Sequence, residues 1–270
     1  MDQSTDTIST SINYRKMGTG PVVVLLHGFP ESGTLWKNIW DDLAASCTLI
    51  IPDLPGSGNT KLEGDTGLDE MATQVKTILD KEGIDKAVVA GHSMGGYVAF
   101  AFADMYPACV SGLSLIHSTP LADDDERKKI RVKSIDLIRK GGKDLFISQM
   151  VPNLFGDTFK LSHPEVVKEM IGEALKMTDD SMINYYNAMM QRPDRTKVLD
   201  WAFFPVQWII GMHDNIISYK KILEQCYRSG INFVSFYNNC GHMSMFEAPE
   251  QLTIDLQRFI HYCDRYQNKP

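Results

Sequence analysis

The stretch KAVVAGHSMGG, residues 86–96, joins an apolar run to a glycine-flanked turn and the start of a helical pattern. The apolar run has the length of a buried strand, and the turn carries the pattern G-x-S-x-G around Ser93. Glycines at positions 91, 95 and 96 remove side chains that would collide with a serine held in a sharp strand-to-helix turn. A helix N-terminus beneath this serine also favours developing negative charge. The stretch therefore predicts that Ser93 is a nucleophile.

Apolar runs of strand length alternate with helical patterns along most of the chain. The strand-like runs are at residues 22–26, 47–51, 87–90, 206–210 and 231–237. The helical patterns are at residues 68–84, 94–106 and 249–262, and Asp69 is expected to cap the first of them. Continuous apolar runs suit strands that are buried on both faces of a parallel sheet. The alternation therefore predicts the α/β class, a mostly parallel sheet flanked by helices.

This alternation stops in the segment 119–199, which has helical patterns throughout. These patterns are at residues 123–140, 142–150, 164–177 and 181–191. The first begins with four acidic residues and continues with Arg127, Lys128 and Lys129, an order that complements the helix dipole and indicates capping. The sequence thus predicts a core formed by residues 1–118 and 200–270, with a helical cap, residues 119–199, inserted between two strands.

A catalytic serine needs a histidine as general base, and the chain has seven histidines. In enzymes with a strand–turn–helix nucleophile, the acid and then the histidine follow the serine in the chain. His242 lies in a loop after the apolar run 231–237, just before the last helical pattern, where it can approach the serine. His261 lies within that last helix and is expected to be a surface or packing residue. His242 is therefore the expected base.

The acid that orients this histidine is expected in the loop after the run 206–210, where Asp214 lies. Asp194 and Asp200 come before that run and would be at the opposite end of the sheet. A minority of such enzymes place the acid after the preceding strand, and there the nearest candidates are residues 123–125. Asp214 is the expected acid, and the earlier position stays open.

Two backbone amides are needed to stabilise the oxyanion of an acyl-transfer intermediate. One is expected from Met94, directly after the nucleophile, and the second from the loop that follows the run 22–26. In this loop Gly28 permits a tight turn, and Pro30 disfavours helical dihedral angles at Phe29. We therefore expect the second amide to be that of Phe29.

Together these motifs resemble the α/β-hydrolase superfamily over the whole length of the chain. HGFPES at residues 27–32 resembles the oxyanion loop of that family, and DLPGSG at residues 53–58 resembles the turn after its next strand. GHM at residues 241–243, with EAPE at 247–250, resembles its histidine loop and the start of its last helix. The resemblance implies the α/β-hydrolase fold with an inserted helical cap.

The oxyanion loop is especially similar to that of the epoxide-hydrolase and dehalogenase branch. Those enzymes attack an alkyl carbon with an aspartate at the position where this chain has Ser93. A serine alkoxide is suited to acyl carbonyls, so the resemblance implies a carboxylesterase-like enzyme that forms an acyl-enzyme. No metal or cofactor is expected.

The predicted cap is rich in methionine and aromatic residues, and Met150, Met189 and Tyr185 are expected to line an apolar acyl pocket. Three alternatives stay open. A carbon–carbon bond hydrolase would use the same triad with basic residues such as Arg192 or Arg195 to bind a substrate carboxylate. A cofactor-free perhydrolase would share the triad, and a non-catalytic small-molecule receptor would keep only the fold.

Composition narrows the class of partners. The chain has 270 residues and a net charge of −7, which argues against nucleic acid as a partner. Residues 1–6 carry acids without a basic and apolar leader pattern, and no apolar run is long enough to span a bilayer. Five scattered cysteines predict reduced thiols. We therefore expect a cytoplasmic enzyme, a monomer or homodimer, that acts on a small molecule.

Overall fold

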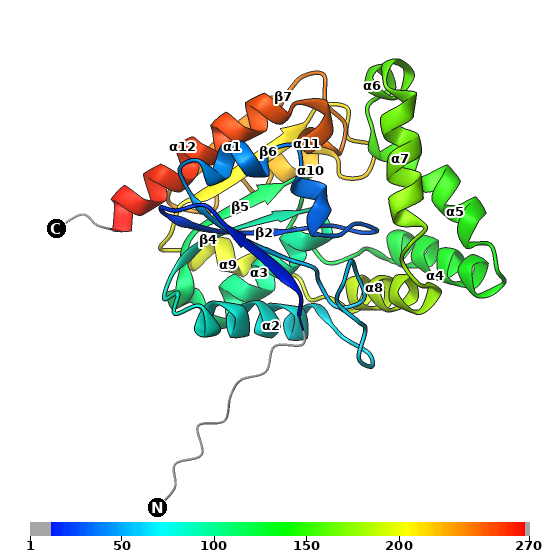
Figure 1. The fold of residues 1–270 in the computed structure, drawn as a ribbon, viewed down its shortest axis with the longest axis horizontal. Helices are drawn as coiled ribbons and strands as arrows, with labels where there is room; N and C mark the ends of the chain where they lie inside the picture. The colour runs from blue at the N-terminus through cyan, green and yellow to red at the C-terminus, as the bar shows by residue number, and fades with distance from the viewer. Residues whose placement is uncertain (1–11, 268–270) are drawn as a thin grey trace, which may run out of the picture.

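The computed structural model describes residues 12–267, and this part of the chain forms one seven-stranded sheet flanked by helices (Figure 1). The leader prediction for residues 1–6 lies outside the described residues. The sheet order is β1-β3-β2-β4-β5-β6-β7; β1 is antiparallel to β3, and the other pairs are parallel. The strands are β1 (Tyr14–Met17), β2 (Val22–Leu26), β3 (Thr48–Pro52), β4 (Ala87–His92), β5 (Val110–Ile116), β6 (Val206–Gly211) and β7 (Asn232–Tyr237). The α/β prediction is confirmed.

Two strands are not predicted by the sequence patterns. β1 is a short edge strand with a mostly polar sequence, so no apolar run marks it. β5 is central and buried, but it contains Gly112 and Ser114. A Cβ atom on Gly112 would lie 2.4 Å from Cys263 Sγ, and the Ser114 hydroxyl donates to buried Gln207 at 2.8 Å. At these two positions β5 has no apolar side chain, since Gly112 is needed for close packing and the Ser114 hydroxyl is hydrogen-bonded. The strand therefore lacks the continuous apolar run by which a buried strand is predicted from sequence.

Helices cover both faces of the sheet. α1 and α12 pack together on one face, and α2 and α3 pack together on the other (Figure 1). These and the remaining core helices are α1 (Trp40–Ala44), α2 (Leu68–Lys81), α3 (Met94–Met105), α9 (Lys197–Trp201), α10 (Tyr219–Leu223), α11 (Ser244–Glu247) and α12 (Pro249–Gln267). The expected cap at Asp69 is wrong by two positions: Gly67 is the N-cap of α2, and Asp69 lies in the first turn, where its charge still favours the helix dipole. None of the described helices is long and apolar enough to cross a membrane.

Five of the α-helices between β5 and β6 precede α9 and make up most of the segment 119–199. They are α4 (Asp125–Arg139), α5 (Lys143–Met150), α6 (Asp157–Ser162), α7 (Pro164–Ala174) and α8 (Asp179–Gln191). They lie on the right of Figure 1, on the side toward which the arrowheads of β5 and β6 point. The acidic start of α4 acts as a cap, because Asp124 accepts a hydrogen bond from the amide of Arg127 at 2.8 Å. The short helices η1 (Gly33–Trp36), η2 (Pro107–Cys109) and η3 (Val151–Leu154) complete the described elements.

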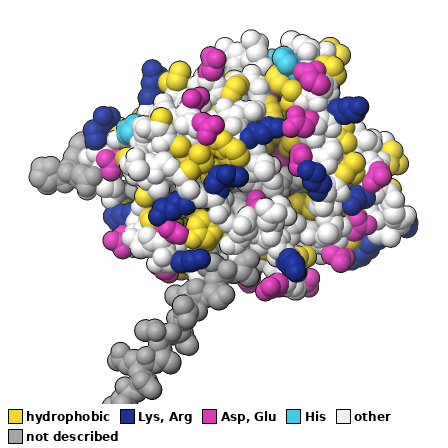
Figure 2. Space-filling view, in the orientation of Figure 1, with side chains coloured by type: hydrophobic (Ala, Val, Ile, Leu, Met, Phe, Trp, Pro, Cys, Tyr) yellow, Lys and Arg dark blue, Asp and Glu magenta, His cyan; other side chains and the backbone are white. Residues whose placement is uncertain are grey.

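The surface carries charges of both signs. Figure 2 shows Lys and Arg side chains interspersed with Asp and Glu on the face in view, with hydrophobic side chains between them.

The parallel register brings the carboxyl ends of the central strands together. Leu26 pairs with Gly91, and His92 pairs with Ile116, which pairs with Ile209. In an open α/β sheet, ligands bind at this edge, in the loops beyond the carboxyl ends of the strands. The loops after β2, β4, β5, β6 and β7 therefore form the candidate site.

Candidate active site

Ser93 occupies a sharp turn between β4 and α3. Its φ and ψ angles are 51° and −115°, a conformation that side chains rarely adopt. The flanking glycines are sterically required: a Cβ atom on Gly91 would lie 2.3 Å from Gly95 O, and one on Gly95 would lie 2.3 Å from Leu26 O. Such strain persists only where surrounding structure enforces it, and it commonly marks functional sites. The turn presents the half-buried Ser93 side chain at the carboxyl edge of the sheet.

The backbone around Ser93 is held by neighbouring strands and loops. The Ser93 amide donates to Ile116 O at 3.0 Å, and the Ser118 hydroxyl donates to Ser93 O at 2.8 Å. Within residues 12–267, neither the Met94 nor the Phe29 amide donates a hydrogen bond to a protein acceptor. Both amides are thus free to bind an oxyanion.

The predicted oxyanion loop lies directly against the nucleophile. A Cβ atom on Gly28 would lie 3.1 Å from Ser93 Cβ and 2.9 Å from Glu31 Oε2, so any larger residue would push the loop away from the serine. Glu31 holds this loop, because its Oε2 accepts a hydrogen bond from the Gly28 amide at 2.9 Å. The neighbouring Phe29 ring packs against Tyr186 with a centroid distance of 4.8 Å.

His242 and Asp214, which the sequence predicts as base and acid, are hydrogen-bonded to each other. His242 Nδ1 lies 2.7 Å from Asp214 Oδ2, and both side chains are almost fully buried. A carboxylate can only accept, so Nδ1 carries a proton, and in the neutral ring Nε2 is left with its lone pair free to accept one. No hydrogen bond joins Ser93 Oγ to His242 among the described residues. In unliganded enzymes such contacts often tighten only when substrate binds.

The Asp214 carboxylate is held in its charged form. Its other oxygen, Oδ1, accepts from the amides of Ile216 at 2.7 Å and Ile217 at 2.9 Å. Burial alone would raise the pKa of Asp214, but the two neighbouring histidines, His242 above all, outweigh it and hold the pKa well below its usual range. The carboxylate can therefore orient His242 and stabilise its imidazolium form.

His117, at the end of β5, is a second histidine beside Asp214. Its Nδ1 lies 3.5 Å from Asp214 Oδ2 and 3.3 Å from the Gly211 amide. Its side chain is fully buried, and burial lowers the pKa of His117 to about 4, so the ring is neutral near pH 7. Its backbone has a positive φ of 50°. The sequence patterns assign no role to this residue.

His92 links the oxyanion loop to the histidine loop. Its Nδ1 lies 3.1 Å from Glu31 Oε2, and its Nε2 lies 2.9 Å from the carbonyl oxygen of His242. Burial would lower the pKa of His92, but the charge of Glu31 and both hydrogen bonds outweigh it and raise the pKa. His92 is the variable residue before the nucleophile in the motif, and Glu31 is part of the oxyanion-loop motif. Neither position reveals from the sequence that the two side chains meet.

The alternative acid position is occupied by an ion pair. Asp123 is buried, and its carboxylate accepts from Arg131 Nε at 2.5 Å and lies 2.9 Å from Arg192 Nη1. Arg192 also donates to the backbone oxygens of Leu121 and Met189 and lies over the Tyr97 ring. The Asp123 carboxylate therefore links α4 to the end of α8, whereas the carboxylate that contacts His242 is that of Asp214.

A second serine–histidine contact lies nearby. Ser57 Oγ is 2.8 Å from His27 Nε2, and both residues are buried. His27 Nε2 also accepts from the Leu54 amide at 2.9 Å, while Nδ1 lies 2.8 Å from Gly28 O. Both ring nitrogens of His27 thus have polar partners, and these contacts connect the loop after β2 to the loop after β3.

The predicted pocket residues lie in the inserted helices. Tyr185 is fully buried, and its ring forms an edge-type contact with the Phe29 ring at a centroid distance of 6.2 Å. Met189 is buried, and Met150 is partly buried against the core. None of the three is among the residues that line a cavity between the core loops and helices α7 and α8. Their role as an acyl pocket stays a prediction.

One group of side chains has the composition of a metal site. Ligand-capable atoms of His117, Asp214 and His242 lie within 4.8 Å of one another in the described part of the chain. Two of these residues are the hydrogen-bonded pair described above, so the cluster has an explanation without a metal.

Comparison with known proteins defines the class. Residues 21–249 match the α/β hydrolase fold family, and the chain therefore belongs to this family.

Solved and curated relatives share this fold or part of the sequence. A thermophilic esterase from Thermogutta terrifontis, solved with malate bound, is 28% identical with a TM-score of 0.89, and the match covers 93% of each chain. A soluble epoxide hydrolase from Corynebacterium sp. is 44% identical over 94 residues, 34% of this chain and 32% of the relative. A pimeloyl-[acyl-carrier protein] methyl ester esterase from Aeromonas salmonicida is 38% identical over 112 residues, 41% of this chain and 42% of the relative. The matches thus span less than half the length of these two curated relatives.

Proposed function

We propose that this protein is a serine esterase that hydrolyses carboxylic esters of small hydrophobic substrates through an acyl-enzyme. The observation that carries the proposal is the 2.7 Å contact between His242 Nδ1 and Asp214 Oδ2, at the sheet edge where Ser93 occupies its strained turn. The similarity to the Thermogutta esterase and to the methyl ester esterase supports ester bonds as the target.

The first half of the reaction forms the acyl-enzyme. His242 Nε2 takes the proton of Ser93 Oγ as this oxygen attacks the ester carbonyl carbon. The carbonyl oxygen becomes an oxyanion, which the free amides of Phe29 and Met94 stabilise. The tetrahedral intermediate then expels the alcohol, which receives the proton held by His242.

The second half releases the acid. A water molecule gives a proton to His242 Nε2 and attacks the acyl carbon, and collapse of the second intermediate returns the proton to Ser93 Oγ. Asp214 stays ionised throughout, since its pKa is held low, and it stabilises the imidazolium that forms in each half. The products are the carboxylic acid and the alcohol.

The inserted helices, within residues 119–199, would act as the cap that covers this centre. Met150, Met189 and Tyr185 would then provide an apolar acyl pocket. Support for this arrangement comes from Tyr185 and Tyr186, both on α8, which pack against Phe29 of the oxyanion loop. The α/β hydrolase fold of the chain supports a small-molecule substrate.

Two basic residues bear on the carbon–carbon hydrolase alternative. That reaction needs a cationic group free to bind a substrate carboxylate. Arg195 is paired with Asp69 and Asp104, and Arg192 with Asp123, so both guanidinium groups are already engaged. Ester hydrolysis is therefore the better supported reaction.

The test is a panel of p-nitrophenyl esters from acetate to decanoate, with hydrogen peroxide added in a parallel series. An esterase turns over at least part of the panel without peroxide. Activity only with peroxide would favour the perhydrolase, and binding without turnover would favour the receptor.

A further inference from the structure

Glu247, the last residue of α11, accepts hydrogen bonds from the backbone on both sides of His242. Its Oε2 accepts from the amide of Gly241 at 3.0 Å, and its Oε1 accepts from the amide of Met243 at 3.0 Å. Hydrogen bonds to an ionised acceptor are stronger than those between neutral groups. One carboxylate thus holds the two residues that flank the candidate base.

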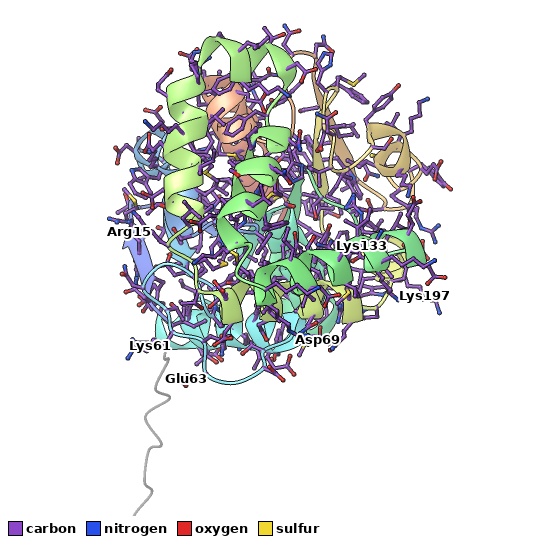
Figure 3. All side chains as sticks on the ribbon, turned by 90° about the vertical axis from the view of Figure 1, so that its right-hand side faces the viewer. Arg15, Lys61, Glu63, Asp69, Lys133 and Lys197 are labelled. Atoms are coloured by element: carbon purple, nitrogen blue, oxygen red, sulfur yellow. The ribbon has the colours of Figure 1, made fainter. Side chains whose placement is uncertain are left out.

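The inserted segment between η3 and α6 contacts the same loop. The amide of Gly156 donates to Glu247 Oε2 at 2.9 Å. The amide of His242 donates to Leu154 O at 2.8 Å. The two backbones approach closely, since a Cβ atom on Gly241 would lie 2.4 Å from Gly156 N. Figure 3 views the molecule from the side of the inserted helices, which lie in front of the core. The insert is therefore attached to the histidine loop itself.

The chemistry of the Glu247 side chain suits this arrangement. Three backbone amides share its two oxygens, and a carboxylate offers an acceptor at both positions. A glutamine has a single oxygen, and its NH₂ group would face a backbone N–H that can only donate. Within residues 12–267, no basic side chain forms an ion pair with Glu247. The carboxylate therefore serves the loop and not a surface ion pair.

The other contacts of His242 do not hold its flanking residues. Its carbonyl oxygen accepts from His92, and its Nδ1 contacts Asp214 at 2.7 Å. A general base must stay within hydrogen-bond reach of the proton that it takes. A misplacement of about 1 Å in an active site can lower the rate about a hundredfold. A shift of the loop backbone would move the imidazole relative to Ser93, and Glu247 opposes such a shift on both sides of the histidine.

We propose that Glu247 is a positioning residue, which keeps His242 within reach of Ser93 by joining the histidine loop to the insert at Gly156. Glu247 acts through the backbone of the loop and takes no proton in the reaction. The insert then has a second role beside covering the site, because its segment 154–156 supports the base. This proposal rests on the proposed esterase function and adds to it a residue outside the triad.

The first experiment compares Glu247→Gln with Asp53→Asn on p-nitrophenyl butyrate. Glu247→Gln should lower kcat about 10- to 100-fold, because the base is misplaced. KM should stay within about twofold of the parent, because no contact with substrate is lost. Asp53 is the matched control, since its carboxylate also accepts from two backbone amides, those of Gly33 at 2.8 Å and Asn59 at 2.9 Å. These amides lie outside the histidine loop, so Asp53→Asn should keep kcat within a few-fold of the parent.

A second pair of variants perturbs the contact from the insert. Gly156→Ala would place a Cβ atom 3.0 Å from Glu247 Oε2, whereas the backbone angles of Gly156, φ −63° and ψ 147°, are ones that alanine adopts without strain. The control is Gly172→Ala in α7 of the same insert, where a Cβ atom would meet nothing within 4 Å. Gly156→Ala should lower kcat several-fold with KM unchanged, and Gly172→Ala should match the parent.

A spectroscopic measurement is independent of ester turnover. The Nδ1 proton between His242 and Asp214 should give a low-field proton NMR signal, assigned by its loss in His242→Gln. The parent and Asp53→Asn should both show this signal. In Glu247→Gln the signal should broaden, because a less firmly held His242 exchanges its Nδ1 proton with water faster. A role of Glu247 in general stability alone would leave the signal of the folded variant unchanged.

Four outcomes would overturn the proposal. They are parent-like kcat in Glu247→Gln, equal losses of kcat in Glu247→Gln and Asp53→Asn, equal losses in Gly156→Ala and Gly172→Ala, and an unchanged NMR signal in Glu247→Gln. If Glu247→Gln does not fold, Gly156→Ala decides, and parent-like kcat in that variant overturns the proposal. If the parent hydrolyses no ester, the proposed function fails, and the NMR comparison alone decides whether Glu247 holds His242.

Discussion

His242 and Asp214 come from loops after two neighbouring strands, and the Nδ1–Oδ2 distance between them is 2.7 Å. The carboxylate is fixed independently of the histidine, because its Oδ1 accepts two backbone amides, those of Ile216 and Ile217. The histidine is fixed from its own backbone, whose carbonyl oxygen accepts from His92. The pair is thus oriented before any substrate binds, and such preorganisation is what a general base requires.

Asp214→Asn should lower kcat about 10⁴-fold while the fold persists. An amide at this position can donate to His242 and so favours the tautomer whose Nε2 carries the proton and cannot act as a base. The matched control is Asp200→Asn, which changes an exposed aspartate paired with Arg228 and should stay within a few-fold of the parent. Steady-state kinetics on p-nitrophenyl butyrate checks both. Equal activity in parent and Asp214→Asn would rule out this acid.

Ser93→Ala should remove nearly all ester turnover, a loss on the order of a millionfold. An active-site phosphonate should label the parent at Ser93, which peptide mass spectrometry can locate. Ser57→Ala is the control, because Ser57 also contacts a histidine but lies buried in a loop contact. It should keep the phosphonate label on Ser93, and an adduct found on Ser57 would contradict the assignment.

Burial of His117 should make the protein less stable as the pH falls from about 6.5 toward 4. The unfolded chain takes up a proton near the ordinary pKa of histidine, whereas the folded chain holds the pKa of His117 at about 4. Unfolding therefore binds a proton in this window, and each such proton changes the free energy of unfolding by about 1.4 kcal/mol per pH unit.

The variant His117→Asn isolates this contribution, and asparagine tolerates the positive φ at this position. Urea unfolding at several pH values between 7.5 and 4.5 should give a shallower pH dependence in the variant than in the parent. Titrating groups that do not contact His117 are shared by both proteins and cancel in the difference. Asp214 does contact it, but His242 is its main partner and still holds the pKa of this carboxyl below the pH range of the measurement. Identical slopes would mean that His117 already carries its proton in the folded state.

Truncation of a predicted pocket methionine should change acyl-chain selectivity without affecting the chemical step. Each methylene buried in an apolar pocket contributes roughly 0.8 kcal/mol, so a change in the pocket alters the preference among chain lengths. Met150→Ala is the first choice, since Met150 is only partly buried, whereas Met189→Ala removes a fully packed side chain and should also cost about 2–5 kcal/mol of stability.

The measurement is kcat/KM for acetate to decanoate esters in the parent, Met150→Ala and Leu145→Ala. Leu145 lies on the same helix as Met150 but is exposed, and its truncation should leave the profile unchanged. Activity on acetate should hold within a few-fold in both variants. A uniform loss over all chain lengths in Met150→Ala would mean that the inserted helices form a structural lid instead of a selectivity pocket.

The sequence determined the fold class and was enough to predict the order of the candidate catalytic residues, because both depend on local patterns. The run before Ser93 is apolar at successive positions, the flanking glycines are dictated by close backbone contacts, and these features are visible in one short stretch. Asp214 and His242 could be predicted because each follows an apolar strand, and parallel strands place their carboxyl ends at one edge.

The tertiary structure alone decided which further side chains meet at this edge. Glu31 and His92 are 61 residues apart, and nothing in either local sequence shows that they pair. His117 follows β5, a strand that close packing at Gly112 hides from hydrophobic patterns. These contacts depend on the order of the strands in the sheet, which is a long-range property of the fold. A local sequence pattern indicates only where one helix or strand begins and ends and which of its faces is buried. Within residues 12–267, the same long-range packing leaves one buried oxygen of Glu31, Oε1, without a hydrogen-bond partner.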